Sequence, residues 1–234
     1  MQAKGQNLKK RRKMQLKNLK LFAITLYCIG FTGLRAQTLK DIEGNVYSTI
    51  TIGTQIWMTE NLKTTKYNNG TAIESVTDNK AWEALATSAF CWYKNDSTAN
   101  KNTYGALYNW YSVNTKKICP IGWHVPTDAE WTILTTFLGG ERVAGNKLKE
   151  TGKKHWSHPN AVATNESGFT ALPSGYRFNT GSFFYIGEYC SWWSSSESDS
   201  NNAWFRYLND SDGIVRRSGF NKRCGFSVRC LRDN

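Results

Sequence analysis

The chain has 234 residues and a formal net charge of +12, from 30 Lys and Arg against 18 Asp and Glu. Nine of the basic residues, and no acidic residue, lie within the first 36 positions, so the remainder has 21 basic and 18 acidic residues. Because the excess charge lies outside the part expected to fold, the composition argues against a nucleic-acid-binding protein. A chain with 14% aromatic and 40% hydrophobic residues is also unlike a disordered one.

The amino-terminal end has the layout of an export signal. Residues 1–20 are basic and polar, residues 21–34 are an apolar run, and Ala36 precedes the expected cut. Since a membrane-spanning helix needs about 20 apolar residues, we expect residues 1–36 to be a cleaved signal peptide and the mature chain to have no transmembrane segment. The protein would then be secreted or held in the cell envelope, in the periplasm or on the outer surface.

Two details of this signal remain open. Translation could start at Met1 or at Met14. Cys28 could be lipidated, but bacterial lipoprotein signals have a small residue before the cysteine, and here that residue is Tyr27. We therefore expect a cleaved signal and not a lipoprotein.

The first half of the mature chain predicts one hairpin and two helices. Residues 46–52 and 55–58 alternate in polarity around a Gly-Thr turn, which indicates a β hairpin. Residues 94–103 suggest a polar loop, and residues 104–113 a short helix. Thr127 and Glu130 form a capping-box pattern that predicts a helix ending at Gly139-Gly140.

The last third of the chain predicts antiparallel β structure. A turn rich in Asp, Ser and Gly at residues 209–213 separates short alternating segments. The candidate strands are residues 191–195, 203–208, 214–217 and 225–231. Taken together, these elements predict one α+β domain over residues 38–234, with short helices and antiparallel β hairpins.

Five cysteines follow the expected cut, at positions 91, 119, 190, 224 and 230. In an exported protein they are expected to form disulfides, and an odd number leaves one over. Their spacings match no zinc site. Spacing alone does not determine which cysteines pair.

Residues for catalysis or metal binding do not stand out. His124 is expected to be a packed residue, His155 and His158 suggest a surface loop, and no Gly-x-Ser-x-Gly turn occurs. We therefore expect no catalytic residues, no metal site and no cofactor. An alternative for the cofactor is a Ca²⁺ site built from acidic and amide side chains in the β-rich third. Those side chains belong to Glu188, Glu197, Asp199, Asn201, Asn202, Asn209, Asp210 and Asp212.

Aromatic, small polar and basic residues alternate between positions 191 and 220. Because neighbours in a strand point to opposite faces, we expect either Trp192 or Trp193 to lie near the surface, where a ring can stack on a sugar or a peptide. The alternative is a large aromatic core. The candidate ligand-binding residues are Trp192, Trp193, Asn202, Trp204, Arg206, Tyr207 and Arg216.

Several motifs resemble the Fibrobacter succinogenes major paralogous domain family, which implies an exported protein of Bacteroidota or their relatives. They run through nearly all of the mature chain in the family's order. The motifs are Asp41-Ile-Glu-Gly-Asn-Val-Tyr47, Ile52-Gly-Thr-Gln-Ile-Trp-Met-Thr-Glu-Asn-Leu-Lys63, Tyr104-Gly-Ala-Leu-Tyr-Asn-Trp110, Cys119-Pro-Ile-Gly-Trp-His-Val-Pro-Thr-Asp-Ala-Glu-Trp131, Trp192-Trp-Ser-Ser-Ser-Glu197 and Gly225-Phe-Ser-Val-Arg-Cys230. The family has no established activity to carry over.

This resemblance has a bearing on the cysteines. The positions of Cys119 and Cys230 look characteristic of the family, whereas those of Cys190 and Cys224 look like additions. It therefore favours the pairs Cys119–Cys230 and Cys190–Cys224, with Cys91 left over.

A weaker resemblance concerns the fold. The segments 125–131 and 225–229 are similar to those of the formylglycine-generating branch of the C-type-lectin-like fold, although Ser227 and Val228 interrupt its terminal Gly-Phe-Arg. This similarity implies a C-type-lectin-like domain and carries no reaction with it.

The sequence thus predicts an exported, non-catalytic binding domain of the envelope or the extracellular space that recognises a glycan or a protein surface. The alternatives are an enzyme of the formylglycine-generating type, a carbohydrate-active enzyme, or a structural envelope protein. The identity of the ligand and the oligomeric state are not predicted.

Overall fold

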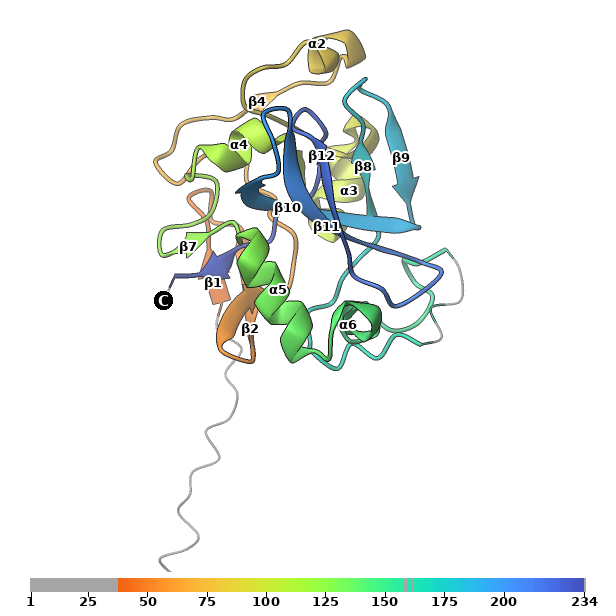
Figure 1. The fold of residues 1–234 in the computed structure, drawn as a ribbon. Helices are drawn as coiled ribbons and strands as arrows, with labels where there is room; N and C mark the ends of the chain where they lie inside the picture. Colours follow the sequence, from red (N-terminus) through yellow and green to blue (C-terminus); the bar gives the residue numbers. More distant parts are fainter. Residues whose placement is uncertain (1–37, 158–159, 161, 234) are drawn as a thin grey trace, which may run out of the picture. The chain divides into compact units, whose positions relative to one another are not determined.

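The structure is a computed structural model that describes residues 38–157, 160 and 162–233 (Figure 1). The expected signal peptide, Cys28 and His158 lie outside the described residues. From residue 38 onward the described residues form one unit of mixed helices and strands, so an α+β fold is confirmed.

The first sheet joins the two ends of the described chain. Its strands are β1 (Thr38–Lys40), β2 (Val46–Ile52), β3 (Gln55–Met58), β13 (Leu231–Arg232) and β7 (Trp123–His124), in that order across the sheet. The predicted hairpin is confirmed: β2 and β3 pair antiparallel, and Gly53 in the turn between them has φ 62°. Near the carboxyl end, β13 pairs with both β3 and β7.

The second sheet forms most of the carboxyl-terminal third. Its strands are β12 (Arg216–Asn221), β11 (Asn202–Asn209), β10 (Tyr189–Glu197), β8 (Ser174–Arg177) and β9 (Phe183–Ile186), in that order. The predicted strands 191–195 and 203–208 are confirmed, and the one expected at 214–217 begins at residue 216. The predicted strand 225–231 is wrong: residues 225–227 make only single bridges, one each to three different elements.

The third sheet is small, and short helices surround the sheets. The sheet holds β4 (Glu74–Ser75), β5 (Ala89–Cys91) and β6 (Leu107–Tyr108). The helices are α2 (Asn79–Glu83), the 3₁₀ turn η1 (Tyr93–Asn95), α3 (Ser97–Tyr104), α4 (Trp110–Asn114), α5 (Asp128–Phe137) and α6 (Glu141–Leu148). Within the described ranges, no helix is long and apolar enough to cross a membrane.

The chain between residues 94 and 114 differs from its prediction. The stretch expected to be a polar loop contains α3, capped by the Asp96 side chain, and the stretch expected to be one helix is β6 followed by α4. The helical pattern fails because Gly105, with φ 73°, ends α3, and the Asn109 side chain caps a new helix.

Helix α5 begins as predicted. The Thr127 side chain accepts a hydrogen bond from the Glu130 backbone, and the Glu130 side chain accepts one from the Thr127 backbone. This capping box is confirmed, and α5 lies against β10 and β11 (Figure 1). It therefore covers one face of the second sheet.

Strand β10 runs between two apolar clusters. Trp192 lies 5.8 Å from Trp131 in one cluster, and Trp193 lies 4.4 Å from Phe226 in the other, measured between ring centroids. Both tryptophans are at most 1% exposed. The expectation that one of them lies near the surface was wrong, because both faces of this strand are covered.

One of the two expected disulfides is present. Cys119 and Cys230 are bonded, as predicted. The expected pair Cys190–Cys224 is wrong, because the two thiols are buried in different apolar clusters and neither is bonded. Cys91 is also unbonded and buried. Three cysteines in the described part of the chain are therefore unpaired, where one was expected.

Candidate ligand-binding site

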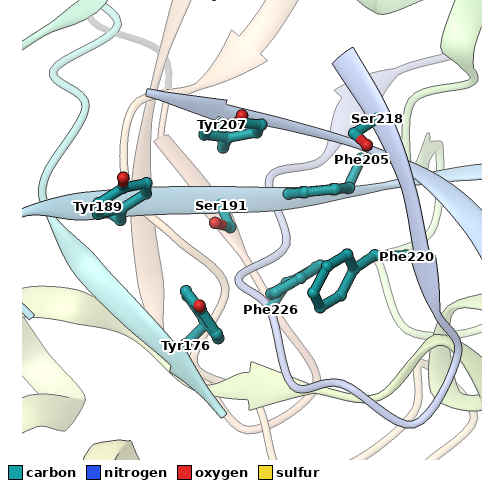
Figure 2. A pocket seen from close by; sticks show the side chains of 8 residues that line it. All are labelled: Tyr176, Tyr189, Ser191, Phe205, Tyr207, Ser218, Phe220 and Phe226. Atoms are coloured by element: carbon teal, nitrogen blue, oxygen red, sulfur yellow. The ribbon is translucent and has the colours of Figure 1, made fainter. Parts of the chain in front are cut away.

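A hollow of about 200 Å³, open to solvent on one side, lies on the second sheet, on the face away from α5. Drug-sized ligands occupy pockets of roughly 300–1,000 Å³, so this one has room for about one small ring. We call it the aromatic hollow. Figure 2 shows the eight residues that line it, none of them charged: Tyr176, Tyr189, Ser191, Phe205, Tyr207, Ser218, Phe220 and Phe226.

Strand register explains why these side chains meet. Ser191 lies opposite Tyr207, and Phe205 lies opposite Ser218, so alternate residues of β10, β11 and β12 point to the same face. Phe226 comes from the irregular segment before β13 and completes the hollow. The site is thus built on strands, which hold side chains more rigidly than loops do.

Three rings form a nearly parallel run along β10 and β11. Phe205 and Tyr207 lie 5.3 Å apart at an interplanar angle of 14°, and Tyr207 and Tyr189 lie 6.1 Å apart at 21°. Phe226 lies 4.7 Å from Phe205, and Tyr176 lies 5.7 Å from Phe226. The hollow therefore offers several ring faces to one ligand (Figure 2).

A cation lies at the edge of the hollow. Arg216 is opposite Tyr207 in the strand ladder, and its guanidinium carbon is 5.9 Å from the centroid of that ring. Both terminal nitrogens of Arg216 donate to Asp212, at 2.9 and 2.5 Å. This hydrogen-bonded pair raises the pKa of Arg216 and lowers the pKa of Asp212. Lys149 in turn donates to the Asp212 backbone oxygen, so the Arg216 side chain is held in place.

The structure brings two of the predicted ligand-binding residues, Tyr207 and Arg216, to the aromatic hollow. The other five lie elsewhere. Trp192 and Trp193 are in the core, and the Asn202 amide donates to Asp199 on the β10–β11 connection.

The remaining two, Trp204 and Arg206, lie on the opposite face of the sheet. Arg206 is fully buried and donates to Asp128 at 2.6 Å. The guanidinium of Arg217 covers the Trp204 ring at 3.3 Å and also contacts Asp128. These side chains hold α5 to the sheet, so Arg206 is not accessible to a ligand.

Among the eight lining residues, only Tyr207 was predicted from the sequence. In β11 it shares its strand face with Phe205, whereas the predicted Trp204 and Arg206 lie on the opposite face. Continuing the alternation into β10 and β12 would have added Ser191 and Ser218. Alternation could not identify Tyr176 and Phe226. They lie in segments that become neighbours of β10 and β11 only through contacts between residues far apart in the sequence.

The histidines and cysteines of the described ranges are the residues to examine for metal binding and thiol chemistry. Those ranges contain no group of three His, Cys, Asp or Glu residues placed to hold a metal ion. His124 is held by Asp233 at 2.6 Å and by Glu130 at 3.0 Å, so both of its ring nitrogens are engaged. Burial raises the pKa of Cys91, Cys190 and Cys224 to about 12, which leaves little thiolate at neutral pH.

Comparison with known families gives a clear result: the model of the Fibrobacter succinogenes major domain matches residues 50–232. The chain belongs to this family. No curated protein and no solved structure matches the chain.

In this family member, the motifs that carried the resemblance are mostly structural. Asn61 and Arg229 are buried and hydrogen-bonded to each other at 3.0 Å, and Cys230 is in the disulfide. Phe226 differs from them, because it both packs against Trp193 and lines the hollow. The last motif therefore links the core to the candidate site.

Proposed function

We propose that this family member is an exported, non-catalytic binding domain with a C-type-lectin-like architecture, and that it recognises a glycan through the aromatic hollow. The leader-like residues 1–36 and the Cys119–Cys230 disulfide support export, because such bonds persist in oxidising compartments. The resemblance at residues 125–131 and 225–229 supports the architecture.

One observation carries the proposal: an open, strand-built hollow lined by six aromatic rings and two serines, with no charged residue among them. Ring faces suit the apolar face of a sugar ring, and hydroxyl groups suit its edges. A neutral ring of about one sugar unit matches this lining and this volume better than an extended peptide does.

The chemistry of the cysteines favours binding over the formylglycine-type alternative. Such a reaction needs a thiolate, whereas the three unpaired thiols are buried and have raised pKa values. The state of these thiols therefore supports binding over thiol-dependent chemistry.

A glycan array tests the proposal. We expect the purified protein to bind a subset of glycans, and Tyr189→Ala to lose that binding at least tenfold. Phe137→Ala is the matched control, because Phe137 is 62% exposed on α5, the helix on the other face of the sheet. An array without signal, or equal loss in both variants, would contradict the proposal.

Export is tested separately by cell fractionation and by sequencing the amino terminus of the exported product. We expect a mature protein that begins at or close to Gln37. An intact chain retained in the cytosol would contradict this part of the proposal.

A further inference from the structure

The two ends of the aromatic hollow differ in their chemistry. In Figure 2, Tyr176, Tyr189 and Tyr207 gather towards one end and Phe205, Phe220 and Phe226 towards the other. Ser191 lies between the two groups. One end therefore offers phenolic hydroxyls and the other only hydrocarbon, apart from Ser218.

The hydroxyl of Ser191 has no partner in the protein. The residue is 2% exposed, and no group in the described ranges forms a hydrogen bond with its Oγ atom. Its Oγ atom is not one of the fully buried polar atoms that lack a partner, so solvent reaches it from the hollow, where a polar ligand atom can take the place of water. Figure 2 shows this hydroxyl inside the hollow.

The hydroxyls at the tyrosine end are available in the same way. Within the described residues, Tyr176, Tyr189 and Tyr207 donate no side-chain hydrogen bond to the protein. Burial raises the pKa of Tyr176 to about 12, so that hydroxyl keeps its proton and can donate at neutral pH. This end suits a ligand edge that carries hydroxyl groups.

The phenylalanine end suits a small apolar group. Phe220 lies 5.4 Å from Phe205 and 5.7 Å from Phe226, and Phe205 lies 4.7 Å from Phe226. These three rings contact one another, so they form one joined apolar surface with no gap between the rings. A plain hexose would place hydroxyl groups against this surface, whereas a methyl-terminated substituent would cover it with hydrocarbon. Ser218, opposite Phe205 in the ladder, adds one hydroxyl beside that surface.

The charges around the hollow argue against an ionic ligand. Arg216 uses both terminal nitrogens on Asp212, so a ligand carboxylate would have to displace that partner. A ligand ammonium group would be repelled by the positive charge of Arg216. No lining residue has a carboxylate to pair with it. A neutral polar substituent avoids both penalties.

We propose that the aromatic hollow selects an N-acetylhexosamine unit, with its acetamido methyl against the surface formed by Phe205, Phe220 and Phe226 and its hydroxyls at the tyrosine end. The amide then lies within reach of Ser191 and Ser218. This inference rests on the proposed glycan-binding function and narrows it to one class of sugar.

Calorimetric titration with three methyl glycosides tests this selection, using N-acetylglucosamine, glucose and glucosamine. We expect the N-acetylglucosamine glycoside to bind at least tenfold more tightly than the other two. Phe220→Ala should remove most of this preference, Ser191→Ala should weaken binding, and Phe137→Ala should change neither. A saturation-transfer experiment on the unmodified protein should give its strongest signal at the acetamido methyl.

The outcomes separate the two proposals. Equal binding of glucose and N-acetylglucosamine, or array binding only to glycans without an acetamido group, overturns the selection and leaves glycan binding intact. A preference that survives Phe220→Ala, or a weak acetamido signal, also overturns the selection. No binding to these glycosides, together with an array without signal, overturns both.

Discussion

Single buried polar residues hold distant segments of this domain together, and Asn61 is the clearest case. Its amide oxygen accepts from Trp192 at 2.9 Å and from Arg229 at 3.0 Å. Its amide nitrogen donates to the Tyr104 backbone oxygen at 2.9 Å and to Ser227 at 3.2 Å. All four hydrogen-bonding positions of this side chain are therefore used.

Replacing Asn61 should be among the most destabilising single changes. Asn61→Ala leaves the buried Arg229 Nε–H and the Trp192 indole N–H each without an acceptor, although the two terminal nitrogens of Arg229 keep the backbone oxygens of Phe169 and Thr170. We therefore expect the free energy of unfolding to fall by about 3 kcal/mol. Urea unfolding measures this. Asn201→Ala, at an exposed asparagine, is the control and should change stability by less than about 0.5 kcal/mol. Equal effects of the two changes would refute the role given to Asn61.

The acid response should depend on Asp128. Burial opposes ionisation of this carboxyl, but the hydrogen bonds from Arg217 and Arg206 outweigh it and lower the pKa of Asp128. A carboxyl whose pKa is lower in the folded state stabilises the fold above its unfolded pKa of about 4, and this stabilisation is lost as the pH falls further.

We therefore expect the melting temperature of the wild-type protein to fall below about pH 4, and Asp128→Asn to reduce the part of that fall caused by this carboxyl. Asp78→Asn is the control, because that carboxylate only caps the short helix α2. Identical pH profiles for the wild type and Asp128→Asn would contradict this account.

Among the helices and strands, the sequence correctly predicted those features that depend on contacts between residues close together in the chain. The capping box at Thr127 and Glu130 was readable because both hydrogen bonds close within four residues. The hairpin of β2 and β3 was readable for the same reason. The helix expected at residues 104–113 was wrong because Gly105 fits closely against Asn61 and the Leu62 carbonyl, a contact that no local pattern reveals.

Trp192 and Trp193 show the same limit on what local sequence patterns can predict. Alternation correctly placed Trp192 and Trp193 on opposite faces of β10, but it could not show that each face has its own apolar cluster. For the aromatic hollow, the interleaving of aromatic and basic residues gave Tyr207 and Arg216. Tyr176 and Phe226 required knowledge of which strands become neighbours.

The stability of helix α5 should depend on the side-chain cap at its amino-terminal end. Thr127→Ala removes the acceptor for the Glu130 backbone N–H, so we expect a loss of about 1 kcal/mol and a melting temperature lower by about 2–4 °C. Thr127→Ser keeps the hydroxyl and should stay close to the wild type. A serine variant as unstable as the alanine variant would show that the cap is not the cause. Calorimetry distinguishes them.

For the whole molecule, the disulfide is the main covalent constraint. It joins Cys119 and Cys230 across a sequence separation of 111 residues and ties β13 to the segment before β7. In the chain-entropy model, a loop of this size stabilises the fold by roughly 4–5 kcal/mol. We expect a Cys119→Ser, Cys230→Ser double variant to lose a stability of this order in urea unfolding.

A thiol titration is the control for this prediction. Unfolded wild-type protein cut at the expected leader site should give three thiols, from Cys91, Cys190 and Cys224, and the folded protein should give almost none, because all three are buried. A single thiol after unfolding would mean that a second disulfide forms, which would contradict the cysteine arrangement described above.

We propose that the ligand contacts the second sheet at the aromatic hollow, on the face away from α5. The most direct test is an NMR titration of protein with isotope-labelled Tyr and Phe rings, using the methyl glycosides of N-acetylglucosamine and glucose. We expect shifts at Tyr189, Tyr207 and Phe220, and none at the exposed Phe137. Unchanged ring signals at saturating sugar, or changes confined to Phe137, would contradict it.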